Sequence, residues 1–342
     1  MMSAVAIVGA GHWGPHLARN FNDHLDSHVL WLIDRDEGRR KAMGERFPAA
    51  ALSDDIKDAL DDDRVDAVVI ATPTTTHHQL VRESLRRGKH VLVEKPLTHS
   101  LGTATELCEL AEKSGLVLMV GHVFLFNKAI ATAREYMISG ELGRLRYVSM
   151  TRTNLGPVRT DVNAAWDLAS HDISVANYWL DSMPLKVSAT GGSWLNEGVE
   201  DIVVATMRYP EGVLVHVEAS WLNPRKRRLI SVVGGERMLT VDDMDLNEPL
   251  RIYNKGVVDG DSPVTDTFAG FRSQIREGEV LIPHVTSGEP LRDECDSFLR
   301  RIRGADDTVS DGWAGAEVVA VLEAMDQSMA RDGLEVPVEA AR

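Results

Sequence analysis

The feature that most constrains this chain is a glycine-rich turn that directly follows a short apolar strand near the N-terminus. Ala4–Val8 predicts a buried strand, and the next six residues, Gly9–Gly14, fit the pattern G-x-G-x-x-G. A helix with apolar residues at helical spacing is expected over Trp13–Phe21. In such units the glycines allow a pyrophosphate to approach the positive end of the helix. The candidate cofactor residues in this turn are Gly9, Gly11, His12, Trp13 and Gly14.

The second predicted strand, Val29–Ile33, ends in an acidic residue, Asp34, 20 residues after the last glycine of the motif. A carboxylate at this place holds the ribose hydroxyls of the adenosine, and it repels a 2′-phosphate, so it favours NAD. Arg35 also belongs to the candidate cofactor site. Together with Arg39 and Arg40 it could pair with the phosphate of NADP. The alternative is that these arginines solvate a helix face.

The first 122 residues alternate short apolar strands with amphipathic helices, which predicts a doubly wound parallel sheet of the Rossmann type. Further strands are expected over Ala67–Ala71, Val91–Val93 and Leu116–Val120, with helices between them. Residues 123–342 contain consecutive strands joined by tight turns, so an α+β domain with a large, open, mostly antiparallel sheet is expected there. A length of 342 residues suits two domains.

Two further segments follow strands of the predicted parallel sheet, where ligands bind in this class of fold. Thr72, Pro73 and His77 follow the strand Ala67–Ala71, and the tripeptide Glu94-Lys95-Pro96 follows Val91–Val93. All but Pro96 are candidate cofactor residues. Lys95 is expected to point into the crevice that takes the nicotinamide.

These three motifs together resemble the glucose–fructose oxidoreductase, inositol dehydrogenase and rhizopine catabolism (Gfo/Idh/MocA) family. Gly9–Gly14, Ala71–His77 and Glu94-Lys95-Pro96 carry the resemblance, and a helix over Asn127–Ser139 followed by a strand extends it into the second half. The resemblance implies an oxidoreductase that transfers hydride between a nicotinamide cofactor and a CH–OH group. It also implies subunit contacts through the second-domain sheet, in a homodimer or homotetramer.

The segment Trp166–Asp172 matches the second-domain mark of the family, an aspartate four residues before a histidine. On a helix, Asp167 and His171 share one face. Histidine titrates near neutral pH and can take the hydroxyl proton of an alcohol, while a carboxylate orients the ring. Lys95 would polarise the reacting oxygen, although it could instead carry the proton. A purely structural alternative makes Asp167 a helix cap and His171 a partly buried histidine.

A polar segment between residues 152 and 163 precedes this helix and is expected to form a wall of the substrate pocket. The candidate substrate contacts are Lys95, Arg152, Arg159, Asp161, Asn163 and His171. The segment looks like that of members acting on nucleotide-linked sugars, whose diphosphate requires cations. Arg159 and the run Arg225–Arg228 are the available cations, although the run could simply be a solvated hairpin. The alternatives are a free polyol of the inositol type as substrate, and a non-catalytic, cofactor-binding regulator.

Composition excludes several other partners. The chain has 37 Lys and Arg against 52 Asp and Glu, a net charge of −15, which argues against nucleic acid polymers and anionic membranes. Two cysteines, no signal-like N-terminus and no apolar run of about 18 residues favour the cytoplasm. No histidine has a zinc-like spacing to cysteine or carboxylate, so no metal site is expected.

Overall fold

The computed structural model describes residues 2–156, 158–257, 275–305 and 308–342, which form two compact units. The N-terminal unit comprises residues 1–126, 289–323 and 339–342. The sheet unit comprises residues 127–288 and 324–338. Each unit has its own sheet and its own core, and each is described by itself below.

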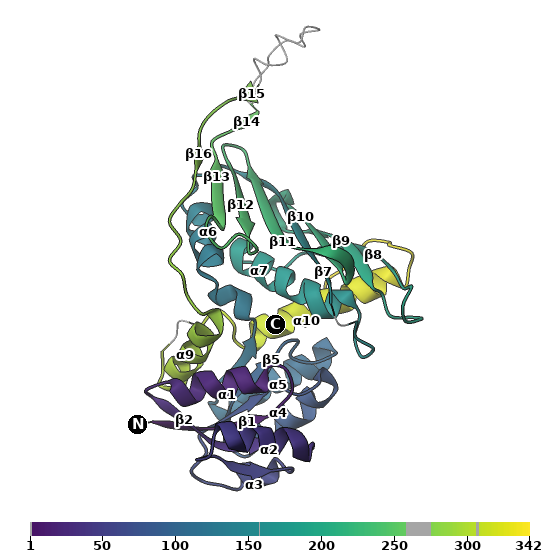
Figure 1. Ribbon diagram of the computed structural model, residues 1–342. Coiled ribbons are helices and arrows are strands. Elements are labelled where there is room, and N and C mark those ends of the chain that lie inside the picture. Colours follow the sequence, from purple (N-terminus) through teal and green to yellow (C-terminus); the bar gives the residue numbers. More distant parts are fainter. Residues whose placement is uncertain (1, 157, 258–274, 306–307) are drawn as a thin grey trace. The chain divides into compact units, whose positions relative to one another are not determined.

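The N-terminal unit contains a six-stranded parallel sheet with the strand order β3-β2-β1-β4-β5-β6 (Figure 1). The strand order reverses between β1 and β4, which is where ligands bind in doubly wound sheets. Buried β-branched and aliphatic residues make up most of the central strands, as expected for a sheet covered on both faces. The strands are β1 (Ser3–Val8), β2 (Ser27–Ile33), β3 (Ala51–Ser53), β4 (Ala67–Ile70), β5 (His90–Glu94) and β6 (Leu118–Gly121).

The helices of this unit follow the predicted alternation. They are α1 (Gly14–Asp23), α2 (Glu37–Arg46), α3 (Lys57–Leu60), α4 (His77–Arg86) and α5 (Leu101–Ser114). Pro15 lies in the first turn of α1, where the missing N–H costs no hydrogen bond. Ser100 caps α5 by accepting a hydrogen bond from the Thr103 N–H, and Gly115 ends that helix in the left-handed conformation.

After the sheet unit, the chain returns to the N-terminal unit. A single boundary at residue 122 would assign this returning segment to the second domain. Helix α9 (Pro290–Ile302) and the first part of α10 (Gly312–Met329) belong to this unit. The apolar stripe of α9, which includes Leu291, Cys295 and Phe298, packs into the core that also holds Leu92 and Met119 of the sheet. Burial of this stripe explains why the C-terminal segment folds back onto the parallel sheet.

The sheet unit is built on a nine-stranded sheet with the order β16-β13-β12-β11-β7-β10-β9-β8-β17. All neighbours pair antiparallel except β7 and β10, which are parallel. The strands are β7 (Leu145–Leu155), β8 (Lys186–Gly192), β9 (Ile202–Arg208), β10 (Leu214–Ser220), β11 (Leu222–Gly234), β12 (Met238–Asp242), β13 (Leu250–Tyr253), β16 (Val280–Leu281) and β17 (Val336–Pro337). A separate two-stranded sheet pairs β14 (Gly256–Val257) with β15 (Ile275–Arg276).

Alternate residues of the large sheet face a helical layer. On β10, Val215, Val217 and Ala219 are buried, whereas Leu214 before them and His216 between Val215 and Val217 are exposed. Helices α6 (Lys128–Ile138) and α7 (Ser170–Leu180), with the second part of α10, supply the helices of this unit (Figure 1). The period of two is the pattern of a sheet with one covered face.

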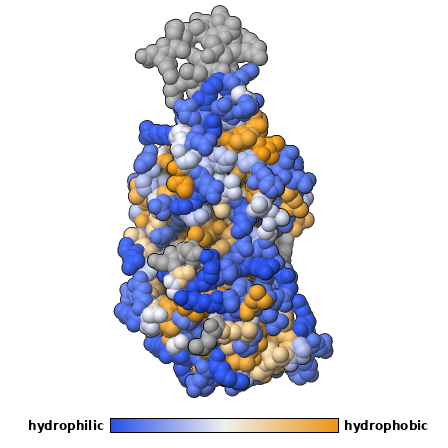
Figure 2. All heavy atoms as spheres, turned by 90° about the vertical axis from the view of Figure 1, so that its left-hand side faces the viewer, coloured by the Kyte–Doolittle hydropathy of each residue, from blue (hydrophilic) through white to orange (hydrophobic). Residues whose placement is uncertain are grey.

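The surface is predominantly polar on the face shown in Figure 2, where hydrophobic side chains lie in separate patches among hydrophilic ones. None of the helices in the described part of the chain is both long enough and apolar enough to cross a membrane.

Candidate functional site

The glycine-rich turn between β1 and α1 has two glycines that the fold itself requires. Gly9 has a φ of +100°, and a Cβ atom there would lie 2.6 Å from the Ala71 carbonyl oxygen. A Cβ atom on Gly14 would lie 1.9 Å from the Gly9 carbonyl oxygen. Both positions therefore exclude a side chain for steric reasons within the protein.

Gly11, between them, has no such internal reason to be glycine. A Cβ atom there would meet no described atom within 4 Å. Its neighbour His12 is exposed, and the His12 ring meets the Trp13 ring edge-on with 5.4 Å between the ring centroids. Trp13 packs against the unit's core. The turn therefore offers an open main-chain surface at Gly11, at the N-terminus of a helix.

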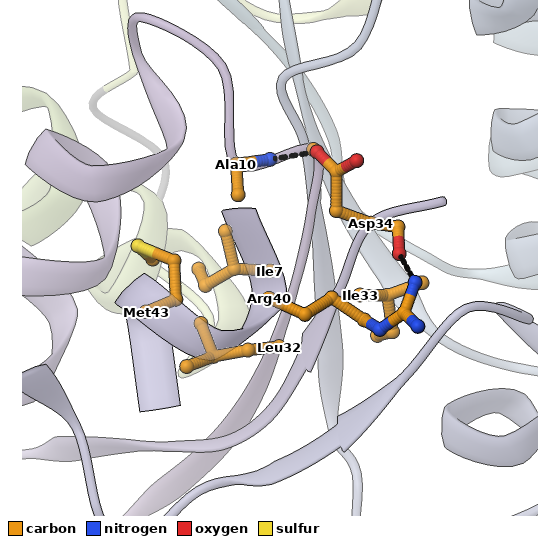
Figure 3. Close-up of a pocket in the computed structure, with 8 residues that line it drawn as sticks. Ile7, Ala10, Leu32, Ile33, Asp34, Arg40 and Met43 are labelled. Atoms are coloured by element: carbon orange, nitrogen blue, oxygen red, sulfur yellow. Dashed lines mark hydrogen bonds between the residues drawn. The ribbon is translucent and has the colours of Figure 1, made fainter. Parts of the chain in front are cut away.

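Asp34 extends from the end of β2 to this turn (Figure 3). One carboxylate oxygen accepts a hydrogen bond from the Ala10 N–H at 2.6 Å, and the other accepts one from the Asp36 N–H at 2.8 Å. Each oxygen keeps further acceptor capacity for a ligand hydroxyl. A small pocket opens beside it, lined by Ile7, Gly9, Ala10, Leu32, Ile33, Asp34, Arg40 and Met43.

Three arginines follow Asp34, and their side chains have different environments. The Arg40 guanidinium donates hydrogen bonds to the carbonyl oxygens of Asp34, at 2.6 Å, and of Arg35, at 3.0 Å. The residues Arg35 and Arg39 are exposed. One of the three is thus fixed on the main chain next to the Asp34 carboxylate, and two extend on the surface.

The loops after β4 and β5 are joined by a buried histidine. The two ring nitrogens of His77 each lie 2.9 Å from a carbonyl oxygen, one of Thr72 and the other of Pro96. Burial lowers the pKa of His77, while its contacts to these carbonyls oppose that shift. Since the ring is fully buried, His77 holds the two loops together, and this replaces the direct cofactor contact expected from the sequence.

Near the predicted Lys95 lie two titratable groups, the half-buried Glu94 at the end of β5 and the buried His122 directly after β6. Burial raises the pKa of Glu94 to about 7, although the charge of Lys95 opposes the shift. Burial also lowers the pKa of His122 to about 3, and the charge of Lys95 lowers it further. The Lys95–Pro96 peptide bond is cis. Lys95 therefore lies near groups with shifted pKa values, as is typical of functional sites.

The spacing predicted a regular α-helix at Asp167 in the sheet unit. The structure differs from this prediction. Ala165–Ala169 forms a π-helical turn, and α7 begins only at Ser170. The Asp167 carboxylate accepts a hydrogen bond from the Trp221 indole N–H at 3.0 Å and another from Arg159 at 3.4 Å. π-Turns inside helices are often found at functional sites. His171 follows in the first turn of α7.

The π-helical turn is anchored by Asn163, which was expected to contact substrate. Its amide oxygen accepts hydrogen bonds from the N–H groups of Ala165 and Trp166. Its amide nitrogen donates to carboxylates of Glu200, at 3.0 Å, and Asp326, at 3.2 Å. Asn163 thus caps the turn, and the expected substrate contact of this half-buried residue stays a prediction.

Asp326 of α10 makes a second hydrogen bond to the same π-helical turn. Its other carboxylate oxygen accepts a hydrogen bond from the Trp166 indole N–H at 2.7 Å. Burial raises the pKa of Asp326, and the hydrogen bonds from Trp166 and Asn163 oppose this shift. The segment that carries Asp167 is therefore tied to a residue 159 positions further along the chain.

Arg152, a second expected substrate contact, forms a buried ion pair instead. Its Nε and Nη2 atoms donate three hydrogen bonds of 2.8–3.1 Å to the Asp172 carboxylate. The two side chains are only 5% and 2% exposed. Because Asp172 directly follows His171, this pair joins β7 to the first turn of α7. Its role is to position the helix, so the expectation of a substrate contact is corrected.

Arg159 and Asp161 remain at the surface of the loop between β7 and the π-helical turn. They form a two-pronged ion pair, with N–O distances of 2.9 and 2.6 Å, and each side chain is about one-third exposed. The hydrogen bond to Asp161 raises the pKa of Arg159, and burial opposes this shift. Arg225, Lys226 and Arg227 on β11 are exposed as well. These four cations are therefore accessible on the loop and on β11.

Several of these residues were not found from the sequence. The indole of Trp221, the carboxylates of Glu200 and Asp326 and the imidazole of His122 lie outside the motifs. Asp172 directly follows His171, but no role was predicted for it. A polar residue on an otherwise apolar helix face, as at Asp326, is the only signal available. Within the described residues, no group of three or more His, Cys, Asp or Glu side chains is arranged to hold a metal ion.

Comparison with known proteins identifies the family. Residues 3–122 match the model described as an oxidoreductase family with an NAD-binding Rossmann fold, and residues 130–240 match the GFO/IDH/MocA C-terminal domain. The chain belongs to the Gfo/Idh/MocA oxidoreductase family. It is therefore an oxidoreductase with an NAD-binding Rossmann domain, and the predicted family, fold class and cofactor are confirmed.

Members of this family with known activities resemble the chain at moderate identity. The scyllo-inositol 2-dehydrogenase (NAD(+)) of Bacillus subtilis is 29% identical over 230 residues, which cover 64% of this chain and 67% of the relative. The UDP-N-acetylglucosamine 3-dehydrogenase of Acidithiobacillus ferrooxidans is 27% identical over 315 residues, covering 92% and 93%. The crystal structure of GenD2 from gentamicin A biosynthesis, in complex with NAD, superposes with a TM-score of 0.81 at 26% identity, covering 99% and 97%.

Proposed function

We propose that this enzyme interconverts a secondary alcohol and a ketone on a nucleotide-linked sugar, with NAD as the cofactor. The observation that carries the proposal is Asp167 on its anchored π-helical turn, one helical turn before His171. A carboxylate and an imidazole fixed in this way are suited to proton exchange with a hydroxyl group.

The glycine-rich turn and Asp34 fit NAD. Gly11 leaves its main chain open at the N-terminus of α1, where a pyrophosphate is favoured by the exposed N–H groups and the helix dipole. The Asp34 carboxylate is directed at the same turn and can accept hydrogen bonds from both ribose hydroxyls. The same carboxylate disfavours a 2′-phosphate, although Arg35 and Arg39 remain exposed beside it and leave NADP as the second candidate.

Three residues are assigned roles in the reaction. His171 takes the proton from the substrate hydroxyl during oxidation and returns it during reduction. Asp167 orients that imidazole and stabilises its charged form. The Lys95 ammonium donates a hydrogen bond to the reacting oxygen and stabilises its developing negative charge. When bound, the nicotinamide ring accepts or supplies the hydride.

A nucleotide-linked sugar is favoured over a free polyol by the exposed cations of the sheet unit. Arg159, Arg225, Lys226 and Arg227 can pair with a diphosphate. A relative that matches 92% of this chain acts on UDP-N-acetylglucosamine by its name. A free cyclitol is the second candidate, because an inositol 2-dehydrogenase of Corynebacterium glutamicum is 27% identical over 98% of this chain.

A comparison of substrates tests this proposal. The values of kcat/KM with NAD are measured for UDP-linked hexoses and N-acetylhexosamines, for the same sugars without the nucleotide, and for inositols. We expect activity with a UDP-linked sugar to exceed that with its free sugar by at least about 100-fold, which corresponds to about 2.7 kcal/mol of transition-state binding. Greater activity with an inositol would support the second candidate. NAD binding without turnover of any of these compounds would indicate a non-catalytic regulator.

We also propose a homodimer or homotetramer formed through the sheet. The face opposite the helical layer exposes Tyr147 on β7 beside Leu214 on β10, which pair in the sheet register. Light scattering should give a mass at least twice 37.7 kDa, and a Tyr147→Asp variant should dissociate. A wild-type protein that is monomeric at micromolar concentration would contradict this arrangement.

The cytoplasm is the proposed location, since Cys108 and Cys295 are both free and buried. Fractionation of the source cells should recover the protein with the cytoplasmic enzymes. Recovery with secreted proteins would contradict the proposal.

A further inference from the structure

Helix α9 buries a carboxyl group in the middle of its apolar face. Glu294 is 1% exposed and lies between Leu291 and Phe298 on the stripe that packs against the parallel sheet. Neither oxygen of Glu294 has a hydrogen-bond partner among the described residues, and the same is true of the Ser297 hydroxyl one turn further on. An isolated buried carboxylate is strongly unfavourable, so this group requires either a proton or a partner.

Glu94 provides that partner at the end of β5. It lies two residues after Leu92, on the same face of the sheet, and Leu92 shares a core with α9. Its register partner on β6 is Gly121. A Cβ atom on Gly121 would lie 3.4 Å from the Glu94 carboxylate, so that carboxylate lies across β6 toward the side that α9 covers. The missing side chain at Gly121 makes room for it.

The charges near this pair are few. Besides burial, the charge of Glu94 raises the pKa of Glu294 well above its usual range. Burial raises the pKa of the Cys295 thiol, and the charges of Glu294 and Glu94 raise it further. His122 is kept neutral, as described above. The charges of Glu289 and Arg19 also act on Cys295. Lys95 is the cation that acts on Glu94, and a single negative charge on the pair is enough to balance it.

We propose that Glu294 and Glu94 share one proton beneath Lys95, and that Glu294 is a positioning residue for the Glu94–Lys95 segment. The neutral Glu294 carboxyl donates a hydrogen bond to the ionised Glu94 carboxylate, because two like charges in one buried site do not ionise together. The pair then carries one negative charge next to one ammonium group. The consequence for Lys95 rests on the proposed function, whereas the shared proton does not.

The pH dependence of unfolding tests the shared proton without any measurement of activity. A glutamate whose pKa is raised in the folded protein stabilises the fold fully below its unfolded pKa of about 4.3, and this contribution is lost as the pH rises toward the folded value. The variant Glu294→Gln keeps the volume and the donor but does not titrate. The unfolding constant of the wild type, divided by that of this variant, should therefore increase about tenfold per pH unit between about pH 5 and pH 7.

Glu109→Gln is the matched control on the exposed face of α5, where Glu109 pairs with Lys113. This variant should not show an increase in that ratio with pH. A constant ratio for Glu294→Gln across the window would overturn the proposal, since Glu294 would then be ionised in the fold. If Glu294→Gln does not fold, ¹³C NMR of the glutamate carboxyls in the wild type decides, because one buried carboxyl must remain protonated at pH 7.

The effect on Lys95 is a separate measurement. When the pair loses its shared proton at high pH, the second negative charge keeps the Lys95 side chain protonated up to a higher pH. Glu294→Gln cannot form that second charge, so the alkaline limb of the kcat/KM profile should move down by about one pH unit. The alkaline limb of Glu294→Gln could stay at the wild-type pH while the ratio of unfolding constants still rises with pH as predicted. That result would disprove only the coupling to Lys95. A failure of the proposed function would remove this profile but leave the unfolding test intact.

Discussion

The two units of this protein prepare their functional residues in different ways. In the N-terminal unit, the candidate residues lie within a few positions of a strand end, and the turn that carries them is fixed by close main-chain contacts such as that of Gly14 with Gly9. In the sheet unit, Asp167 is held by Arg159 of the preceding loop and by side chains from distant parts of the chain, namely Trp221 and, through the π-helical turn, Asp326.

This difference determines how each site tolerates amino-acid substitutions. A cofactor site made from main-chain atoms depends on a few glycines and is largely indifferent to the side chains elsewhere. A proton-transfer segment held by buried polar side chains depends on each partner, because every lost partner leaves another polar group unsatisfied. The following predictions test this contrast, beginning with the largest expected effect.

Replacement of Lys95 by Ala should have the largest effect on turnover. Loss of a preorganised donor to the reacting oxygen is expected to lower kcat by about 10²–10³-fold, while the affinity for NADH, followed by its fluorescence, should change little. Lys113→Ala, which alters an exposed lysine on α5, is the control. Equal turnover in the two variants would contradict the role assigned to Lys95.

The buried ion pair between Arg152 and Asp172 should contribute strongly to the stability of the sheet unit. Arg152→Met leaves the Asp172 carboxylate buried without its main partner, which should lower the free energy of unfolding by about 3–5 kcal/mol in chemical denaturation. The double variant Arg152→Met, Asp172→Leu should recover most of this loss. A single variant as stable as the wild type would show that water reaches this pair.

Substitutions of Gly14 and Gly11 in the cofactor turn should affect different properties, the first the stability of the fold and the second the binding of NADH. Gly14→Ala places a Cβ atom against the Gly9 carbonyl, and it should lower the free energy of unfolding by roughly 3 kcal/mol. Gly11→Ala should change that free energy by less than about 0.5 kcal/mol and raise the Kd for NADH about tenfold or more. If Gly11→Ala binds NADH normally, the pyrophosphate does not approach the main chain at this residue.

The remote anchor Asp326 should influence turnover but not cofactor binding. In Asp326→Asn, the new amide group cannot accept from both Trp166 and Asn163 as the carboxylate does, so the turn that carries Asp167 should loosen and kcat should fall about tenfold. Gln327→Ala, at an exposed neighbouring position, is the control. A lower NADH affinity with an unchanged kcat would contradict the assignment.

The same contrast explains what could be predicted from the sequence. The strand, the glycine pattern and Asp34 lie close together in sequence, so their spacing predicted the turn, the parallel sheet and the direction of the carboxylate. The consecutive strands joined by tight turns likewise predicted the second sheet. Local patterns were sufficient because each of these features is decided by neighbouring residues.

Other features depend on contacts that a sequence pattern does not contain. The return of α9 to the N-terminal unit depends on where its apolar stripe finds a partner, and the π-helical turn depends on anchors more than 30 residues away. The residues Arg152 and Asn163 have the right chemistry for substrate but are occupied by Asp172 and by the turn itself. Polar residues near a site are therefore ambiguous until their internal partners are known.

The central claim, that the protein exchanges hydride between NAD and a CH–OH group of a nucleotide-linked sugar, is tested most directly by isotope transfer. UDP-N-acetylglucosamine carrying deuterium on its pyranose ring carbons is incubated with NAD and the enzyme, and the nicotinamide product is analysed by mass spectrometry. The account predicts one deuterium per reduced nicotinamide. Turnover of an unlabelled inositol with no reaction of any nucleotide-linked sugar would contradict it.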